Sequence, residues 1–258
     1  MPEGDTVYRA AKNLDAALAG QELTRCDIRV PKFATVDLTG EVIHDVVSRG
    51  KHLLLRAGDY TIHSHLKMEG SWHLYRHGTK WRRPAHTARI VLETAEWVAV
   101  GFSLGTLEVV ETDDEDSIVG YLGPDLLGPD WDADEAIRRL TAEPARPVGL
   151  ALLDQRVMAG LGNVYRNELC FLRGVLPTRP MGEVDDPVRL VALAHRLIHA
   201  NKERVERTTT GKLRGETDWV YGRRGKPCLR CGTPIVEGVL GENELQERET
   251  FWCPRCQT

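Results

Sequence analysis

The sequence is poor in the features that mark secreted, membrane-spanning and disulfide-rich proteins. Its 258 residues include only six cysteines, and no apolar run approaches the roughly 18 residues that a membrane helix needs. Residues 1–5 contain neither a basic nor an apolar stretch, so they do not resemble a secretory signal. We therefore expect a globular cytoplasmic protein, in which disulfides are uncommon.

An excess of positive charge is also missing, because the net charge is −4. That average argues against a nucleic-acid partner, but it hides an asymmetry. Residues 202–230 hold nine Lys or Arg against four Asp or Glu, whereas residues 111–116 are nearly all acidic. A charge acts over about 10 Å at moderate salt, so a basic region on an acidic chain can still bind phosphates. A solvated charged surface is the alternative explanation.

The chain changes pattern twice. Short runs rich in Val, Ile and Leu, separated by turn formers, predict a sandwich or barrel that follows an N-terminal helix. Helical spacing of apolar residues begins after the turn-rich segment 120–131, and the segment from about residue 219 is too short for a core of its own. The predicted helices are 5–19, 132–141, 147–159, 163–173 and 186–204, and the predicted strands are 42–47, 52–56, 61–66, 89–92, 97–102 and 107–110.

Four cysteines form two C-x2-C pairs with 21 residues between them, namely Cys228, Cys231, Cys253 and Cys256. This spacing is typical of a tetrahedral four-thiolate zinc site around a β-hairpin. Zinc binding of about 10–16 kcal/mol is enough to fold so short a segment. Four protein ligands leave no open position, so we predict one structural Zn²⁺. Disulfides or free thiols are the alternatives, and Cys26 and Cys170 are expected in the core.

A turn with few side chains, Ala159-Gly160-Leu161-Gly162-Asn163, joins two predicted helices. Glycines allow a ligand to approach the backbone closely, and free N–H groups at a helix start attract anions. A phosphate is the natural ligand, with the Asn163 amide as a further donor. A simple corner between helices explains the same residues.

Four short motifs together resemble the formamidopyrimidine-DNA glycosylase/endonuclease VIII family, in its endonuclease VIII-like branch. They are Met-Pro-Glu-Gly at residues 1–4, Arg-Gly-Lys-His at 49–52, Gly-Leu-Gly-Asn at 160–163, and Val-Tyr-Gly at 220–222 before the zinc motif. The resemblance covers the whole chain. It implies an α+β protein with an N-terminal β-sandwich and helix (1–120), a helix-two-turns-helix domain (121–218) and a zinc-finger hairpin (219–258), with DNA in the cleft between the halves.

The resemblance also implies a chemistry at the N-terminus. After removal of Met1, the secondary amine of Pro2 attacks C1′ of a damaged nucleoside and forms an iminium, or Schiff base. An α-amino group titrates at about 7.7–8.0 and a lysine at about 10.4, so a terminal amine is far more often unprotonated at neutral pH. Glu3 matches the acid that protonates the sugar. The target base must first leave the stack.

The remaining site residues follow from the same resemblance. Lys51 matches the hairpin lysine that contacts phosphate and assists β-elimination, and Arg248 matches the zinc-finger arginine linked to δ-elimination. The predicted DNA contacts are Asn163, Gly162, Met68, His65 and His86. Since a lone histidine is more often structural, the two histidines are the least specific of these.

Three departures from the family pattern bear on the substrate. The void-filling Arg-Arg-Phe-Gly loop is replaced by Phe102-Ser103-Leu104-Gly105, so Phe102 or Leu104 is a candidate wedge beside Met68. Residues 208–219 are short where 8-oxoguanine-recognising members carry a capping loop. With the Pro-Glu-Gly opening, these features favour oxidised pyrimidines over 8-oxoguanine.

We therefore predict a monomeric base-excision repair glycosylase with AP lyase activity that acts on damaged DNA. A catalytically silent DNA-damage or junction-binding module is the first alternative, although it would need neither Pro2 nor Glu3. A structural zinc protein without a nucleic-acid partner is the second, and it would lack the salt-dependent affinity that phosphate contacts produce.

Overall fold

The chain divides into two units, with the boundary between Tyr121 and Leu122. The first unit contains two four-stranded antiparallel sheets. The structure is a computed structural model, and it describes residues 2–258. One sheet has the strand order β1-β6-β7-β5 and the other β2-β3-β4-β8. The elements are α1 (Gly4–Leu18), β1 (Arg25–Ile28), η1 (Pro31–Phe33), β2 (Ile43–Arg49), β3 (His52–Ala57), β4 (Tyr60–His65), β5 (Ser71–Arg76), η2 (Ala85–Thr87), β6 (Ala88–Glu93), β7 (Trp97–Phe102), β8 (Thr106–Glu111), η3 (Thr112–Asp114) and α2 (Asp116–Val119).

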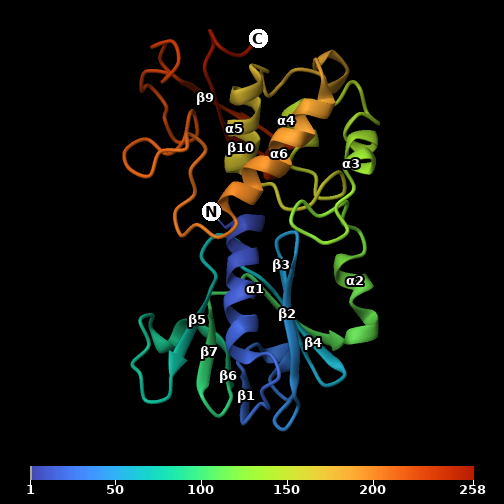
Figure 1. Ribbon diagram of the computed structural model, residues 1–258, viewed down its shortest axis with the longest axis vertical. Helices are drawn as coiled ribbons and strands as arrows, with labels where there is room; N and C mark the ends of the chain where they lie inside the picture. The colour runs from blue at the N-terminus through green and yellow to red at the C-terminus, as the bar shows by residue number, and fades with distance from the viewer. Residues whose placement is uncertain (1) are drawn as a thin grey trace. The chain divides into compact units, whose positions relative to one another are not determined.

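Helix α1 closes the core of this unit by contacting strands of both sheets (Figure 1). Its apolar residues recur every three or four positions and so form one buried stripe. The strands contribute alternate residues, such as Leu53 and Leu55 of β3, because successive side chains point to opposite faces. The helical part of this core is Val7, Ala11, Leu14 and Leu18.

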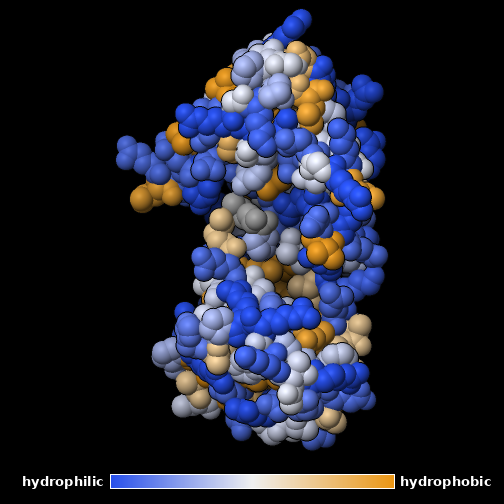
Figure 2. Space-filling model, turned by 90° about the vertical axis from the view of Figure 1, so that its left-hand side faces the viewer, coloured by the Kyte–Doolittle hydropathy of each residue, from blue (hydrophilic) through white to orange (hydrophobic). Residues whose placement is uncertain are grey.

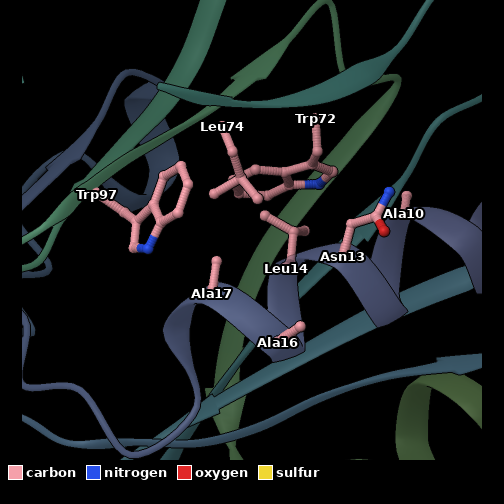
Figure 3. A pocket seen from close by; sticks show the side chains of 8 residues that line it. All are labelled: Ala10, Asn13, Leu14, Ala16, Ala17, Trp72, Leu74 and Trp97. Atoms are coloured by element: carbon pink, nitrogen blue, oxygen red, sulfur yellow. The ribbon is translucent and has the colours of Figure 1, made fainter. Parts of the chain in front are cut away.

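A groove remains open between α1 and the first sheet. Figure 3 shows the indoles of Trp72 and Trp97 facing the small side chains of α1. The guanidinium carbon of Arg76 lies 3.8 Å from the centroid of the Trp97 ring. Elsewhere the surface in Figure 2 is mostly hydrophilic, and its apolar side chains form small separate groups.

The second unit is helical, with a two-stranded hairpin near its end. Helix α5 is its centre, because residues 163–171 are all buried, and both α6 and β10 contact it (Figure 1). No helix within residues 2–258 combines the length and apolar content needed to cross a membrane. The elements are α3 (Ala133–Leu140), α4 (Val148–Ala151), α5 (Asn163–Arg173), η4 (Met181–Glu183), α6 (Pro187–Asn201), β9 (Val236–Leu240), η5 (Glu244–Gln246) and β10 (Arg248–Trp252).

One polar side of α5 binds the backbone of strand β10. The side-chain nitrogens of Asn163 (Nδ2) and Arg166 (Nη2) each donate to the carbonyl of Glu249 at 2.9 Å. Asn167 accepts from the backbone nitrogen of Phe251 at 2.7 Å. Strand β10 pairs only with β9 in its sheet, so these side chains satisfy the backbone groups on its other edge.

The next residue of α5, Glu168, is fully buried and binds the segment before the hairpin. Its carboxylate accepts from the backbone nitrogens of Trp219, Val220 and Tyr221 at 2.7–2.9 Å, and from the Thr209 hydroxyl. Consecutive N–H groups of this kind form an anion-binding nest. Burial raises the pKa of Glu168, and these hydrogen bonds oppose the rise. The Val-Tyr-Gly motif therefore lies at a carboxylate anchor.

Most predicted elements are present, with four differences. The predicted helix 147–159 is wrong, because α4 ends at Ala151 and turns follow. Helix α5, by contrast, has the predicted bounds 163–173, and Gly162 is its cap. Helix α6 ends at Asn201 rather than at residue 204, and strands β1 and β5 were not predicted. The half-buried pattern of β5 alternates only weakly, which explains the omission.

We expect Glu168→Gln to lower the free energy of unfolding by about 3 kcal/mol, because the new amide group places donors against buried N–H groups. Urea unfolding of the full chain measures the change. Glu143→Gln is the matched control, since its side chain is 73% exposed. Equal stability of the two variants would contradict the anchor.

Candidate active site and zinc site

The predicted nucleophile and acid lie at the start of α1. Glu3 is the N-cap residue, and its carbonyl oxygen accepts from the backbone nitrogens of Thr6 (2.9 Å) and Val7 (3.1 Å). Its side chain has no exposed surface, and a carboxylate near a helix N-terminus is stabilised by the helix dipole. Pro2 directly precedes it and is partly exposed. Met1, whose removal the predicted chemistry requires, lies outside the described residues.

Lys51 lies on a two-residue turn between β2 and β3. Arg49 pairs with His52 across the hairpin, so Gly50 and Lys51 are the two central turn residues. Gly50 has φ +57°, which is the conformation that favours glycine at the first central position of a tight hairpin turn. The sequence Arg-Gly-Lys-His thus places Lys51 in the tight turn between β2 and β3.

A chain of hydrogen bonds runs from the residue after this lysine. His52 Nδ1 lies 2.8 Å from His63 Nε2, and His63 Nδ1 lies 3.1 Å from a carboxylate oxygen of Glu108. In the other direction, His52 Nε2 lies 3.0 Å from the hydroxyl of Tyr121. We call these four residues the His52 chain.

The predicted DNA contacts of the first unit are on its surface turns. Met68 is 63% exposed in the turn after β4. His65 ends β4, and its Nδ1 accepts from the backbone nitrogen of Lys67 at 3.0 Å. His86 is exposed in η2. The candidate wedges Phe102 and Leu104 are instead buried, at 0% and 6% exposure, so neither side chain is presented to solvent.

The Gly-Leu-Gly-Asn turn packs inside the second unit. Gly160 has φ +114°, and its backbone nitrogen donates to the Gln155 side chain at 3.1 Å. Asn163 is 4% exposed, and its amide nitrogen binds the Glu249 carbonyl. Gly162 caps α5 without a side chain. The side chain of Asn163, which is the predicted phosphate contact, therefore already makes a hydrogen bond within the folded unit.

The four predicted cysteine ligands come together in one cluster. Their sulfur atoms all lie within 4.8 Å of one another, with Cys231 and Cys253 at 3.5 Å. Those separations exceed a disulfide bond and suit four ligands around one ion. A tight turn shapes the first pair, since Gly232, at φ +77°, donates its N–H to the Cys228 carbonyl at 2.9 Å. The four-thiolate donor set fits zinc.

Arg248 begins β10, opposite Leu240. Its side chain is exposed, and Nη1 donates to the Glu247 carbonyl at 2.8 Å. The longer loop of this finger, residues 241–247, directly precedes it. Glu242 of that loop pairs with Arg146 at 2.5 Å.

Sequence reasoning missed the His52 chain and the Glu168 anchor. The spacing His63-x-His65 in a predicted strand was a usable signal, because both residues then face the same side as a paired His52. Nothing in the sequence pointed to Tyr121 or to the nest at Trp219–Tyr221, because those partners are far away along the chain.

Three family models match the chain over nearly all its length. They are the formamidopyrimidine-DNA glycosylase N-terminal domain at residues 1–103, the H2TH domain of the same enzyme at 122–212, and the zinc finger found in FPG and IleRS at 225–258. The chain therefore belongs to the formamidopyrimidine-DNA glycosylase family.

Several similar relatives are named endonuclease 8, and one is named an AP lyase. The chain is 56% identical to the Mycolicibacterium smegmatis protein named DNA-(apurinic or apyrimidinic site) lyase Nei2, over all of this chain and 99% of the relative. It is 54% identical to probable endonuclease 8 2 of Streptomyces coelicolor, over all of this chain and 94% of that protein. Endonuclease 8 of Escherichia coli is 30% identical over the full length of both.

Solved structures show the same fold. A MutM complex with carbocyclic 8-oxo-G containing DNA matches with a TM-score of 0.82 at 24% identity, covering both chains completely. The Lactococcus lactis Fpg complex with abasic-site DNA matches with 0.81 at 24%, also over both chains. The predicted family, fold class and structural zinc site are thus confirmed.

We expect Cys253→Ser to lose bound zinc and the structure of the hairpin, because the remaining three thiolates no longer close the site. Zinc released per protein, measured with a chelating dye, checks this. Cys26→Ser, which lies outside the cluster, is the control and should retain one zinc. Full zinc in Cys253→Ser would contradict the assignment.

Three histidines of the second sheet, His52, His63 and His65, predict that the folded protein loses stability in mild acid. Burial lowers the pKa of His52 to about 3 and of His65 to about 4, and also lowers that of His63. Below about pH 6.5 the unfolded chain therefore binds protons that the folded chain does not, so stability falls as pH falls from 6.5. Urea unfolding at pH 7.5, 6.5 and 5.5 measures it.

His52→Gln should weaken this pH dependence, whereas His44→Gln, at an exposed position, should keep it. Identical pH dependence of His52→Gln and the unsubstituted chain would contradict the role of His52.

Proposed function

We propose that this protein is a bifunctional DNA glycosylase and AP lyase that excises oxidised bases through Pro2 and then cuts the strand. The observation that carries the proposal is the presence of Pro2 and Glu3 at the start of α1 in a chain of this family. A binding module would require neither residue. The names of the relatives, which include an AP lyase, support the same activity.

The proposed reaction has two stages. The secondary amine of Pro2 attacks C1′, the glycosidic bond breaks, and the base leaves with a proton while Glu3 protonates the sugar and its ring opens. The resulting iminium makes the C2′ proton acidic, so its removal expels the 3′ phosphate by β-elimination. Lys51 contacts the phosphate and assists this step. Arg248 contacts phosphate and supports δ-elimination of the second phosphate.

We propose DNA contacts on both units. In the first, Met68 enters the gap left by the extruded base, and His65 and His86 bind the backbone. In the second, the turn at Gly162 and Asn163 binds phosphate through its backbone nitrogens and the Asn163 side chain. The basic residues 202–230 support a phosphate-binding surface on this unit.

Oxidised pyrimidines are the proposed substrates. In the segment that replaces the void-filling loop, Phe102 and Leu104 are buried, and residues 208–219 form a short segment. The three-domain division at residues 120 and 218, a monomeric state and a cytoplasmic location belong to the same proposal. The domain division rests on the changes in sequence pattern, and the monomeric state on a single-lesion site, which needs no symmetry.

Borohydride trapping tests the nucleophile, because reduction turns the iminium into a stable amine. Duplexes with an abasic site, thymine glycol or 8-oxoguanine are incubated with the unsubstituted chain and with Pro2→Gly, Glu3→Gln and Lys51→Ala. We expect a covalent band that maps to Pro2 and is strongest with thymine glycol among the base lesions. Glu3→Gln should lose the band on base lesions, a drop of about 100-fold or more.

N-terminal sequencing of the purified chain is the control, since Pro2 has a free amine only after Met1 is removed. With Met1 removed and no band on any duplex, the glycosylase proposal would fail, and salt-dependent binding would favour the binding module.

A further inference from the structure

The outer face of the second sheet carries a group of polar side chains, and a segment of the same unit crosses it. Because alternate residues share a face, His52, Arg56, Thr61, His63 and Glu108 all lie on the side opposite the apolar core. Residues 112–121, which contain η3 and α2, bind this face at two points. These residues form the last part of the first unit before the chain continues into the second.

The first attachment point is Glu115. Its carboxylate accepts from Arg56 Nε at 2.7 Å and Nη2 at 2.8 Å, and from the Thr61 hydroxyl at 2.6 Å. Such a two-point contact between guanidinium and carboxylate fixes orientation as well as distance. The end of the segment nearer β8 is therefore held to the ends of β3 and β4 that meet at their connecting turn.

The second attachment point is Tyr121, through the His52 chain. A Glu108 carboxylate only accepts, so His63 Nδ1 carries a hydrogen and neutral His63 accepts at Nε2. His52 must then donate from Nδ1, which leaves its Nε2 to accept from the Tyr121 hydroxyl. The direction of every bond is thus determined when both imidazoles are neutral.

Charges around His52 favour that neutral form. Arg49 of β2 and His65 of β4 each pair with His52 across the sheet. Lys51 precedes His52, and Lys67 follows His65 by two residues. Burial, and then the neighbouring His63, His65, Lys51 and Lys67, lower the pKa of His52 to about 3, and burial lowers that of His63, against the opposing effect of Glu108. Both rings therefore remain neutral at the pH of the cytoplasm, and the direction of the chain is maintained.

We propose that Tyr121, His52, His63 and Glu108 are positioning residues for Lys51, which hold the turn of the hairpin and attach it to the segment that leads to the second unit. This inference rests on the role of Lys51 in the proposed function. Neighbouring side chains hold His52 at both ring nitrogens, so its backbone, and the turn that it ends, cannot shift independently of Tyr121. A misplaced lysine would slow elimination, because small displacements of a reacting group reduce rates strongly.

A double-mutant cycle tests whether Tyr121 acts through Lys51. Single-turnover cleavage of an abasic-site duplex is measured for the full zinc-loaded chain, Tyr121→Phe, Lys51→Ala and the double variant. We expect Tyr121→Phe to lower the rate about tenfold, and to cause no further loss in the Lys51→Ala background. Tyr60→Phe, at a position that is also partly exposed, is the matched control and should keep the full rate.

A conservative variant and a pH titration separate positioning from general damage. Glu108→Gln keeps an acceptor for His63 and should retain most of the rate, whereas Glu108→Leu should lose as much as Tyr121→Phe. Without the tyrosine hydroxyl, His52 takes up a proton more readily. The titration of the His52 ring, followed by NMR, should therefore move toward neutral pH in Tyr121→Phe, by about one unit.

The outcomes distinguish the two proposals. Full activity of Lys51→Ala would overturn the role of Lys51 and this inference with it. An impaired Lys51→Ala together with a fully active Tyr121→Phe would overturn the inference alone. Equal losses from Tyr121→Phe in both backgrounds would also overturn it, since Tyr121 would then act independently of the lysine.

Discussion

The hydrogen bonds between α5 and two backbone segments determine the organisation of the second unit. Asn163, Arg166 and Asn167 satisfy one edge of β10, and the next residue, Glu168, fills the nest at Trp219–Tyr221. A hairpin of two strands is marginal alone, and zinc supplies only the cross-link between its ends. The helix therefore determines where the finger lies, and the zinc determines that it is folded. Arg248 takes its position from both, because it begins the strand that α5 holds.

In the first unit, polar groups on the outer face of the second sheet likewise need hydrogen-bond partners. One face packs on the apolar core with α1, while the other carries histidines, Arg56 and Thr61. Such a face would ordinarily be solvated, but residues 112–121 cover part of it through Glu115 and Tyr121. Buried polar groups of this kind are stable only when each has a partner, and the His52 chain meets that condition over four consecutive groups. The acidic residues 111–116 thus include one with a structural role, Glu115, and are not solvated charge alone.

Sequence reasoning was most accurate where the signal is local. The zinc cluster follows from cysteine spacing, β7 follows from a short apolar run, and α3 lies within its predicted range. The helix predicted at 147–159 failed because apolar residues at helical spacing also suit a buried turn: Val157 and Met158 are core residues outside any helix. Helix α5 has its predicted bounds, 163–173, but the Asn163 amide donates to the Glu249 carbonyl of β10, which the sequence did not indicate. The roles of Glu168 and Tyr121 depend on partners 51 and 69 residues away, respectively, which no local pattern contains.

The two turns that the proposed function places at the extruded base are linked by one side chain. Arg83 donates to the Glu69 carbonyl at 2.8 Å and to the Ser71 hydroxyl at 2.9 Å, and its Nη2 reaches the Ser103 hydroxyl at 3.1 Å. The turn after β7, with Ser103 at φ +46°, is therefore tied to the turn that presents Met68. Because Phe102 and Leu104 are buried, Met68 alone remains as the proposed wedge, and its flexible thioether adapts to irregular gaps. In the proposed function, a wedge presented by a turn that Arg83 fixes in place would respond to the opening in the stack more than to the identity of the opposite base.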